Sequence, residues 1–188
     1  MTTLNGLCMM AVAAAALSAC ALAQPSHRDA SVPITVEPSV DLQRYAGRWY
    51  EIARYPNWFE RGCQDVTAEY ALQADGRVRV VNTCVRPDAQ PPVFVADGRA
   101  RVVEGSNNAK LRVSFAPEWI PFAWGDYWVL EVDDAYQTAL VGAPNGGYLW
   151  ILARTPSIAP ETRAHLEEAA RRNGFDPSKL ENTVHTRS

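Results

Sequence analysis

The sequence has few of the residues on which catalysis and metal binding most often depend. It contains three histidines and four cysteines in 188 residues, and no histidine lies in a segment that alternates like a β-strand. A Ser–His or Cys–His nucleophile would therefore have no base within a sheet, and no set of histidines could hold a metal or a haem. We predict a protein that is not an enzyme and has no metal or cofactor, with His27, His165 and His185 solvated at its surface.

Excess positive charge is also missing. Lysine and arginine number 18 against 21 acidic residues, which gives a formal net charge of −3. A nucleic-acid-binding face needs a basic patch, and adhesion to anionic membranes by charge needs a polybasic segment. We therefore expect no nucleic-acid partner. The hydrophobic fraction of 47% and the length suit one globular domain with a buried core.

The N-terminus carries the pattern of a secretion signal. An unbroken apolar run covers Leu7 to Leu17, which is too short to span a bilayer and suits the central region of a signal peptide. It leads into Leu17-Ser18-Ala19-Cys20, which resembles the lipobox of bacterial lipoproteins, where cleavage precedes an acylated cysteine. We predict a signal peptide over residues 1–19 and lipidation of Cys20, which by resemblance places the protein at the periplasmic face of the bacterial outer membrane. The alternative stays open that cleavage follows Ala21-Leu22-Ala23 and releases a soluble periplasmic protein.

Residues 20–40 are polar and punctuated by proline. Such segments favour polyproline II, which extends about 3.1 Å per residue. We expect a lipid-anchored spacer that holds the folded domain, residues 41–188, roughly 50 Å from the membrane.

From residue 41 onward, short apolar–polar alternations are separated by turn signals, as is typical of a β-barrel or β-sandwich. We expect residues 49–55 and 66–72 to form one long, interrupted strand, followed by a hairpin at Asp75-Gly76. One helix should begin at Pro160 and end before Gly174. Because residues 127–132 and 148–154 are apolar on both faces, this helix should pack outside the sheet.

Two segments more than a hundred residues apart carry a resemblance to a known family. The first opens with Gly47-Arg48-Trp49, and the second, which begins at Tyr148, ends with Leu152-Ala153-Arg154. Phe59-Glu60-Arg61-Gly62 and Asn173-Gly174-Phe175-Asp176 also match, in order and at suitable spacing. From about residue 41 to 180 the chain resembles the lipocalins, and most closely the bacterial outer-membrane lipoproteins of the apolipoprotein D-like branch.

The resemblance implies an all-β fold: an eight-stranded up-and-down antiparallel barrel with one C-terminal α-helix packed outside. It also implies that Trp49 plugs the closed end, that Arg154 lies across its indole, and that Gly47 lets the chain turn there. A guanidinium over an indole gains about 2 kcal/mol when desolvated, and arginine suits such stacking better than lysine. A barrel of about eight strands can hold one small ligand.

The aromatic residues indicate where that ligand would bind. Some lie on loops at the expected mouth, and others point inward by strand alternation. The candidate ligand-binding residues are Trp58, Tyr70, Phe94, Phe115, Trp119, Phe122, Tyr127, Val129 and Trp150. An apolar pocket with a few orienting donors suits an amphiphile such as a lysophospholipid or a fatty acid, although core packing also explains each residue.

We therefore predict a protein that binds and stores or transports small hydrophobic or amphiphilic lipids in the cell envelope and supports membrane maintenance under stress. Two alternatives stay open: a lipocalin-type enzyme that acts on a bound lipid, and a structural envelope lipoprotein with a filled barrel. A homodimer is also left open.

Cys63 and Cys84 flank the hairpin at Asp75-Gly76. Two cysteines in an exported domain most simply form a disulfide, although the pairing needs a bulge in the first arm of the hairpin. The alternative is a reactive thiol, for which Arg61 is the nearest stabiliser of a thiolate.

Glu131 is the acidic residue of most interest. By alternation it shares a face with Tyr127 and Val129, so we expect it inside the barrel. A carboxylate buried there must be paired or protonated.

Overall fold

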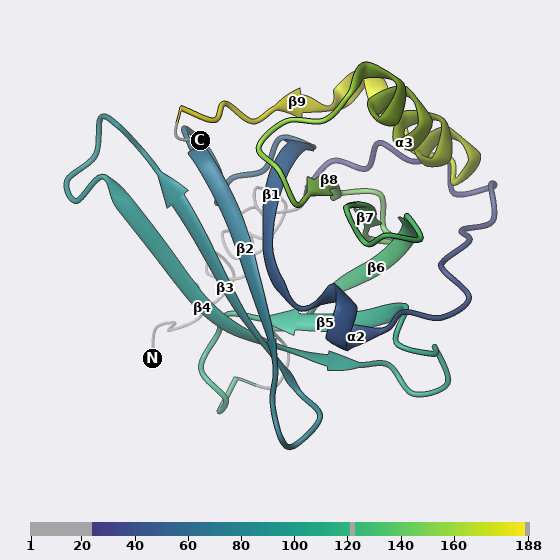
Figure 1. Ribbon diagram of the computed structural model, residues 1–188, viewed down its shortest axis with the longest axis horizontal. Coiled ribbons are helices and arrows are strands. Elements are labelled where there is room, and N and C mark those ends of the chain that lie inside the picture. The colour runs from purple at the N-terminus through teal and green to yellow at the C-terminus, as the bar shows by residue number, and fades with distance from the viewer. Residues whose placement is uncertain (1–23, 121–122, 187–188) are drawn as a thin grey trace, which may run out of the picture.

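The computed structural model describes residues 24–120 and 123–186 and shows one closed antiparallel barrel (Figure 1). The strands are β1 (Gly47–Arg54), β2 (Gln64–Leu72), β3 (Val78–Val85), β4 (Val93–Val102), β5 (Lys110–Ser114), β6 (Gly125–Val132), β7 (Thr138–Gly142), β8 (Leu149–Ala153) and β9 (Glu181–Asn182). From β2 to β8 each strand pairs with the next along the chain, and β1 pairs with both β8 and β2, which closes eight strands into a barrel. The predicted up-and-down barrel is confirmed.

The segment expected to be one interrupted strand is in fact two neighbouring strands. β1 and β2 run antiparallel, with Gly47 opposite Tyr70 and Tyr50 opposite Thr67. The connection between them reverses the chain at Pro56, which has no N–H to continue a ladder. It ends at Gly62, whose φ of 74° lies in the region that glycine tolerates best. The prediction of a single long strand was therefore wrong.

β1 and β2 stay paired only over the half of β1 nearest Gly47. Beyond that point the C-terminal segment fills the gap: β9 pairs with Ala53 and Arg54, and the Asp65 N–H donates to the Val184 oxygen at 2.8 Å. In Figure 1 this yellow segment runs from the helix α3 across β1 to the upper end of β2. We call this region, residues 51–65 together with 181–186, the β1–β2 seam.

The closed end is built as the sequence predicted. Trp49 is fully buried, and its indole N–H donates to the Tyr45 oxygen at 2.8 Å. The Arg154 guanidinium lies 3.9 Å from the centroid of the indole and donates to four main-chain oxygens of residues 44–48, at 2.7 to 3.2 Å. Gly47 has φ 92°, a conformation that an L side chain rarely adopts.

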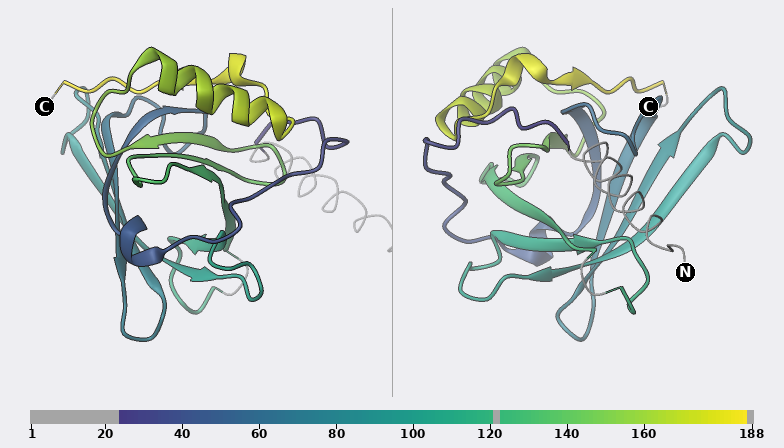
Figure 2. Two further views of the ribbon diagram at one scale, coloured as in Figure 1. Left: turned by 45° about the vertical axis from the view of Figure 1, so that its right-hand side comes forward. Right: turned by 180° about the vertical axis from the view of Figure 1, so that it is seen from behind.

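The helix α3 (Pro160–Arg172) lies outside the barrel, as predicted, where Figure 2 shows it against the sheet. Its buried residues Leu166, Ala169 and Ala170 pack in one cluster with Leu130 and Leu140. The described residues also form two shorter helices, α2 (Leu42–Tyr45) at the closed end and the 3-10 turn η1 (Pro177–Lys179) after α3.

Glu131 lies on the outer face of the barrel, so the prediction that it points inward was wrong. The β6–β7 pairing shifts register between Val129 and Glu131, and a bulge of this kind turns the following side chain to the other face. The Glu131 carboxylate bonds to Arg172 at 3.0 Å and also to His165, both on α3. It therefore ties the helix to the barrel.

Residues 24–40 do not form a free spacer. They pack along the barrel, where the His27 N–H donates to the Gly146 oxygen at 2.9 Å and the Glu37 N–H donates to the Val129 oxygen at 3.0 Å. Ile34 and Val36 contact the buried core. Cys20 and the expected signal peptide lie outside the described residues, among which no helix is both long and apolar enough to cross a membrane.

The predicted disulfide is present. Cys63 and Cys84 are bonded, with their Cα atoms 5.3 Å apart and a separation of 21 positions in sequence. The bulge that the pairing required occurs in β2, where the register shifts between Gln64 and Thr67. Closing a loop of this length stabilises the fold by roughly 3 kcal/mol in the chain-entropy account, and the alternative of a reactive thiol at either position is wrong.

We expect Arg154→Lys to lower the free energy of unfolding by roughly 2 kcal/mol, because an ammonium cannot stack on Trp49 and bond the surrounding carbonyls at once. Urea denaturation measures this loss, while ligand affinity should change little. Arg48→Lys is the matched control, since Arg48 is exposed and lies 3.8 Å from the exposed Glu69. An Arg154→Lys protein with unchanged stability but lost ligand binding would contradict the structural role.

Candidate functional site

A cavity of about 580 Å³ opens at the end of the barrel opposite Trp49. Its side walls come from the inward faces of the strands, including Ala68, Val80, Val113 and Leu152, and its rim comes from the β1–β2, β5–β6 and β7–β8 loops. Pockets that bind small molecules usually have volumes of about 300–1,000 Å³ and mostly apolar walls. Its size and walls therefore suit a small ligand.

Two buried tyrosines, Tyr70 and Tyr127, form the floor of the cavity, and a third, Tyr45, lies beneath them in the core. The Tyr127 hydroxyl lies 2.9 Å from the hydroxyls of both Tyr45 and Tyr70. Burial raises the pKa of Tyr70 to about 12 and also raises those of Tyr45 and Tyr127, so all three stay neutral. Beneath them the core leaves a void of only about 20 Å³. A ligand that enters from the mouth therefore meets hydroxyl groups at its deepest point.

Most of the predicted site residues meet in this cavity. Tyr70, Phe115, Tyr127 and Trp150 line its walls and floor, and Trp58 lies at its rim. Val129 is fully buried beneath the tyrosine floor and is absent from the cavity wall. It belongs to the core that supports the floor.

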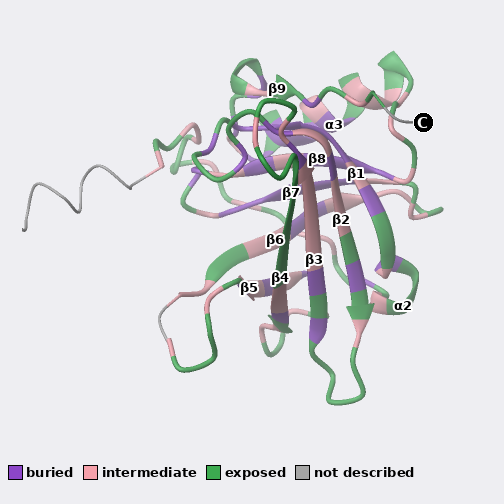
Figure 3. Cartoon of the chain, turned by 90° about the vertical axis from the view of Figure 1, so that its left-hand side faces the viewer, coloured by how far each residue is buried: buried purple, intermediate pink, exposed green. Residues whose placement is uncertain are grey.

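Three further candidates lie elsewhere. Phe94 is opposite Cys84 in the ladder and 36% exposed, on the part of the β3–β4 hairpin that extends beyond the barrel (Figures 1 and 3). Its ring packs under the Arg86 guanidinium at 4.6 Å. Trp119 is 79% exposed in the β5–β6 loop and does not line the cavity, while Phe122 lies outside the described residues.

The open end carries most of the exposed apolar surface. Figure 3 shows exposed residues concentrated on β4 near this end. The exposed large apolar side chains here are Trp58, Phe59, Val93, Phe94, Val95, Phe115 and Trp119. Exposed apolar side chains gathered at one end of a protein are typical of a surface that contacts a ligand, a partner or a membrane.

A buried polar cluster in the β1–β2 seam forms part of the same cavity, and the sequence analysis missed it. Arg54 Nη1 lies 3.1 Å from the Glu51 carboxylate, and Arg54 Nε lies 3.4 Å from the Glu60 carboxylate. The Thr183 hydroxyl donates to Glu51, and the Asn57 amide donates to Glu60. We call these five residues the seam cluster. Glu51 and Glu60 also line the cavity.

The seam cluster holds two carboxylates against one guanidinium. Glu51 is 3% exposed, and burial raises its pKa to about 8, with the charge of Glu60 adding to the rise and Arg54 opposing it. Glu51 therefore carries a proton at neutral pH. Strand alternation could have predicted that Glu51 points inward, because it lies two residues after the inward-facing Trp49. The sequence could not show that Thr183, 132 residues away, is its hydrogen-bond partner.

His185 also enters the seam, so the prediction of a solvated side chain there was wrong. Its ring Nε2 donates to the Glu51 main-chain oxygen at 2.7 Å, and its ring packs edge-on against Tyr50 with centroids 5.6 Å apart. The C-terminal segment buries it because that segment replaces β2 as the neighbour of β1.

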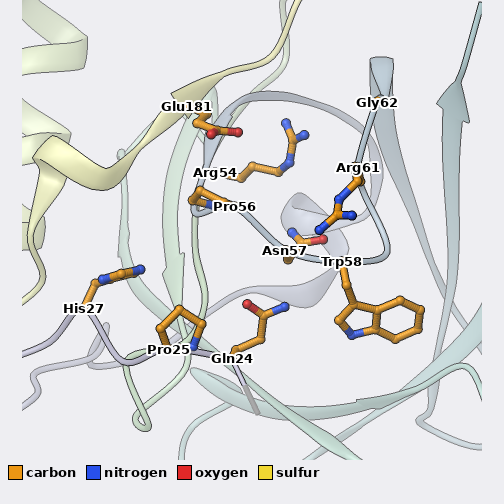
Figure 4. A pocket seen from close by; sticks show the side chains of 10 residues that line it. All are labelled: Gln24, Pro25, His27, Arg54, Pro56, Asn57, Trp58, Arg61, Gly62 and Glu181. Carbon is orange, nitrogen blue, oxygen red and sulfur yellow. The ribbon is translucent and has the colours of Figure 1, made fainter. Parts of the chain in front are cut away.

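A second pocket of about 460 Å³ lies on the other side of Arg54. Figure 4 shows Arg54 and Glu181 on one side of it and Gln24, the first described residue, on the other, with Trp58 nearby. Trp58 lines both this pocket and the barrel cavity. The described N-terminal segment therefore begins beside the mouth of the barrel.

Comparison with known proteins agrees with this architecture. The family model described as a lipocalin-like domain matches residues 40–185. The chain belongs to the lipocalin family. It is 42% identical over 147 residues to the outer membrane lipoprotein Blc of Escherichia coli K12, covering 78% of this chain and 80% of that one. Mouse apolipoprotein D is 33% identical over 154 residues, covering 79% and 78%.

The solved structures support the fold at lower identity. Insecticyanin from the tobacco hornworm Manduca sexta superimposes with a TM-score of 0.65 at 19% identity, covering 85% of this chain and 86% of that one. At this identity the likeness shows the lipocalin fold alone.

Among the described residues, no group of three histidine, cysteine, aspartate or glutamate side chains could hold a metal ion.

The raised pKa of Glu51 predicts a loss of stability at high pH. Between its ordinary value of 4.5 and about 8, the folded protein binds a proton that the unfolded chain has released. The free energy of unfolding should therefore fall as pH rises through this window. We expect Glu51→Gln to be more stable than wild type at pH 9 by ~1–3 kcal/mol, measured by urea denaturation at pH 6 and pH 9. Glu168→Gln is the control, because Glu168 is exposed on α3 and pairs with Arg171, and it should keep the wild-type pH dependence. An equal loss in the Glu51→Gln protein would contradict the assignment.

Proposed function

We propose that this lipocalin binds one long-chain amphiphile, such as a lysophospholipid or a fatty acid, and stores or transports it in the cell envelope. The observation that carries the proposal is the cavity of about 580 Å³, whose walls are mostly apolar. The acyl chain would lie inward and the polar head near the mouth.

The apolar surface that a ligand can bury in the cavity sets the expected affinity. Removing apolar surface from water yields about 25 cal/mol per Å². A chain that buries on the order of 300 Å² would gain several kcal/mol before the entropy costs of binding, which corresponds to micromolar rather than picomolar affinity. Such a carrier could both take up and release its ligand.

The position of Gln24 supports a role at a membrane. A Cβ atom on Gly147 in the β7–β8 loop would lie 3.0 Å from the Gln24 Cβ, which places Gln24 against the rim of the cavity. Cys20 precedes it by four positions, a reach of at most about 14 Å for an extended chain. An acylated Cys20 would therefore hold the mouth, with its exposed aromatic side chains, close to the lipid surface.

We accordingly propose an outer-membrane lipoprotein on the periplasmic side that exchanges lipid with the membrane and supports its maintenance under stress. The name of the Escherichia coli relative, an outer membrane lipoprotein, agrees with this location. Cleavage after Ala23 would instead give a soluble periplasmic carrier.

The two alternative functions have less support. An enzyme acting on bound lipid would use a free thiol or Glu131, but Cys63 and Cys84 are bonded and Glu131 bonds to α3. A purely structural lipoprotein would have a filled barrel, whereas the cavity above the tyrosine floor is large enough for a ligand.

Binding should depend on chain length. In a series of single-chain amphiphiles with one head group, we expect affinity to rise with each added methylene by about 0.8 kcal/mol until the cavity is full. Quenching or a blue shift of tryptophan fluorescence, to which Trp150 contributes, measures the binding. Tyr127→Ala should weaken it, provided that circular dichroism shows a folded barrel. An equal response to short and long chains would show that the cavity does not hold the chain.

Lipidation can be tested separately. We expect Cys20→Ala to move the protein from the membrane fraction to the soluble periplasm, or to leave it uncleaved, and to abolish incorporation of labelled palmitate. Cys8→Ala, within the expected signal peptide, is the matched control and should leave both unchanged. Absence of palmitate from the wild-type protein would favour cleavage after Ala23.

A further inference from the structure

Acidic side chains, and no basic ones, are among the described residues that line the cavity. Glu51, Glu60 and Asp126 are acidic, and no lysine, arginine or histidine is among the described residues of its wall. Asp126 lies 3.8 Å from Arg112, which balances it. Glu51 and Glu60 share the single guanidinium of Arg54. The β1–β2 seam is therefore the side of the cavity where carboxyl groups outnumber the basic groups that pair with them.

Arg54 does not line the barrel cavity, and its two terminal nitrogens are bonded within the seam. Its Nη1 donates to Glu51 at 3.1 Å and to Thr183 at 3.2 Å, and its Nη2 donates to the Glu60 main-chain oxygen at 3.0 Å. It lines the second pocket and is absent from the wall of the barrel cavity. A carboxylate or phosphate in the barrel would therefore meet two carboxylic groups with no available cation.

Aromatic rings lie beside these acids. Tyr148 and Trp150 are stacked with centroids 5.4 Å apart and an interplanar angle of 3°, and Phe59 lies 5.9 Å from Tyr148. Burial and the charge of Glu60 raise the pKa of Tyr148, so the negative potential of Glu60 extends to these rings. Electron-rich ring faces next to a carboxylate are the surroundings that ammonium groups prefer.

A separate observation, on strand β3 of the cavity wall, also indicates a hydrogen-bond donor on the ligand. The amide oxygen of Asn82 is buried and has no hydrogen-bond partner among the described residues, and Asn82 lines the cavity. A buried acceptor without a donor costs free energy. A ligand N–H at this position would remove that cost.

We propose that the cavity selects amphiphiles whose head group carries an ammonium, held between Glu51, Glu60 and the rings of Tyr148 and Trp150, over amphiphiles with an anionic head group alone. This inference rests on the proposed function and narrows its ligand class. Binding would take place by ion pairing and cation–π contact, with no covalent step.

Titration of Glu51 gives this selection a pH dependence. A cationic head favours the ionised carboxylate, so binding should release the proton that Glu51 carries at neutral pH, and affinity should rise as pH increases. The titratable groups that face Glu51 are Arg54 on β1, Glu60 in the β1–β2 loop, Tyr70 on β2, and His185 with Asp65 behind it.

The test compares three probes of equal chain length with the purified, delipidated full-length protein. Dodecyltrimethylammonium, dodecanoate and 1-monododecanoylglycerol are titrated below their critical micelle concentrations at pH 7.5, with calorimetry and tryptophan fluorescence as readouts. We expect the ammonium to bind about tenfold more tightly than dodecanoate, with the neutral glyceride between them. Dodecanoate that binds as tightly as the ammonium would overturn the inference while leaving the proposed function intact. Failure of all three probes to bind would overturn both.

Two further measurements locate the head group. Glu60→Gln should reduce the ammonium preference to about twofold or less, whereas Glu131→Gln on the outer face should leave it unchanged. If Glu60→Gln does not fold, the wild-type protein alone decides the matter. Its affinity for dodecyltrimethylammonium, a probe that does not titrate, should rise about tenfold from pH 7 to pH 9. An affinity that stays flat over this range would overturn the placement at Glu51.

Discussion

The contact between Arg154 and Trp49 is the interaction on which the rest of the barrel depends. It joins the first strand to the residue that follows the eighth, and the same guanidinium bonds four main-chain oxygens of residues 44–48 at the barrel floor. Because this end is closed, the cavity opens at the opposite end, between the β1–β2, β5–β6 and β7–β8 loops. The tyrosine hydroxyls above Trp49 then become the deepest polar groups that a ligand can reach.

A second constraint follows from the divergence of β1 and β2. A barrel cannot leave two strand edges unpaired in its wall, and here the C-terminal segment supplies the missing hydrogen bonds through β9 and residues 183–186. The seam is not a regular ladder, so polar side chains fill it. Burial of the seam cluster is what raises the pKa of Glu51 and gives the cavity its acidic side.

The mouth of the barrel combines several features that are far apart in the sequence. The segment that begins at Gln24 packs along α3 and the β7–β8 loop and starts beside Trp58 (Figure 4). The exposed aromatic side chains of the β1–β2 and β5–β6 loops are at the same end. Entrance, apolar rim and N-terminal segment therefore share one side of the molecule, which is the arrangement that a carrier exchanging lipid with a membrane would need.

The sequence by itself determined those features that depend on local periodicity or on a strong pairwise chemistry. Strand alternation placed Tyr70, Phe115, Tyr127 and Trp150 in the interior, the proline and glycine signals bounded α3, and the paired motifs around Trp49 and Arg154 predicted the closed barrel. Only the tertiary structure decided where alternation fails or where partners come from distant segments. A bulge turned Glu131 outward, and a single shift of register is not encoded in apolar periodicity. The seam cluster and the burial of His185 required the C-terminal segment to enter between β1 and β2. The packing of residues 24–40 depended on main-chain bonds to β6, the β7–β8 loop and the end of α3. Main-chain hydrogen bonds cannot be predicted from the residue types in a segment, because every residue type except proline can donate and all can accept.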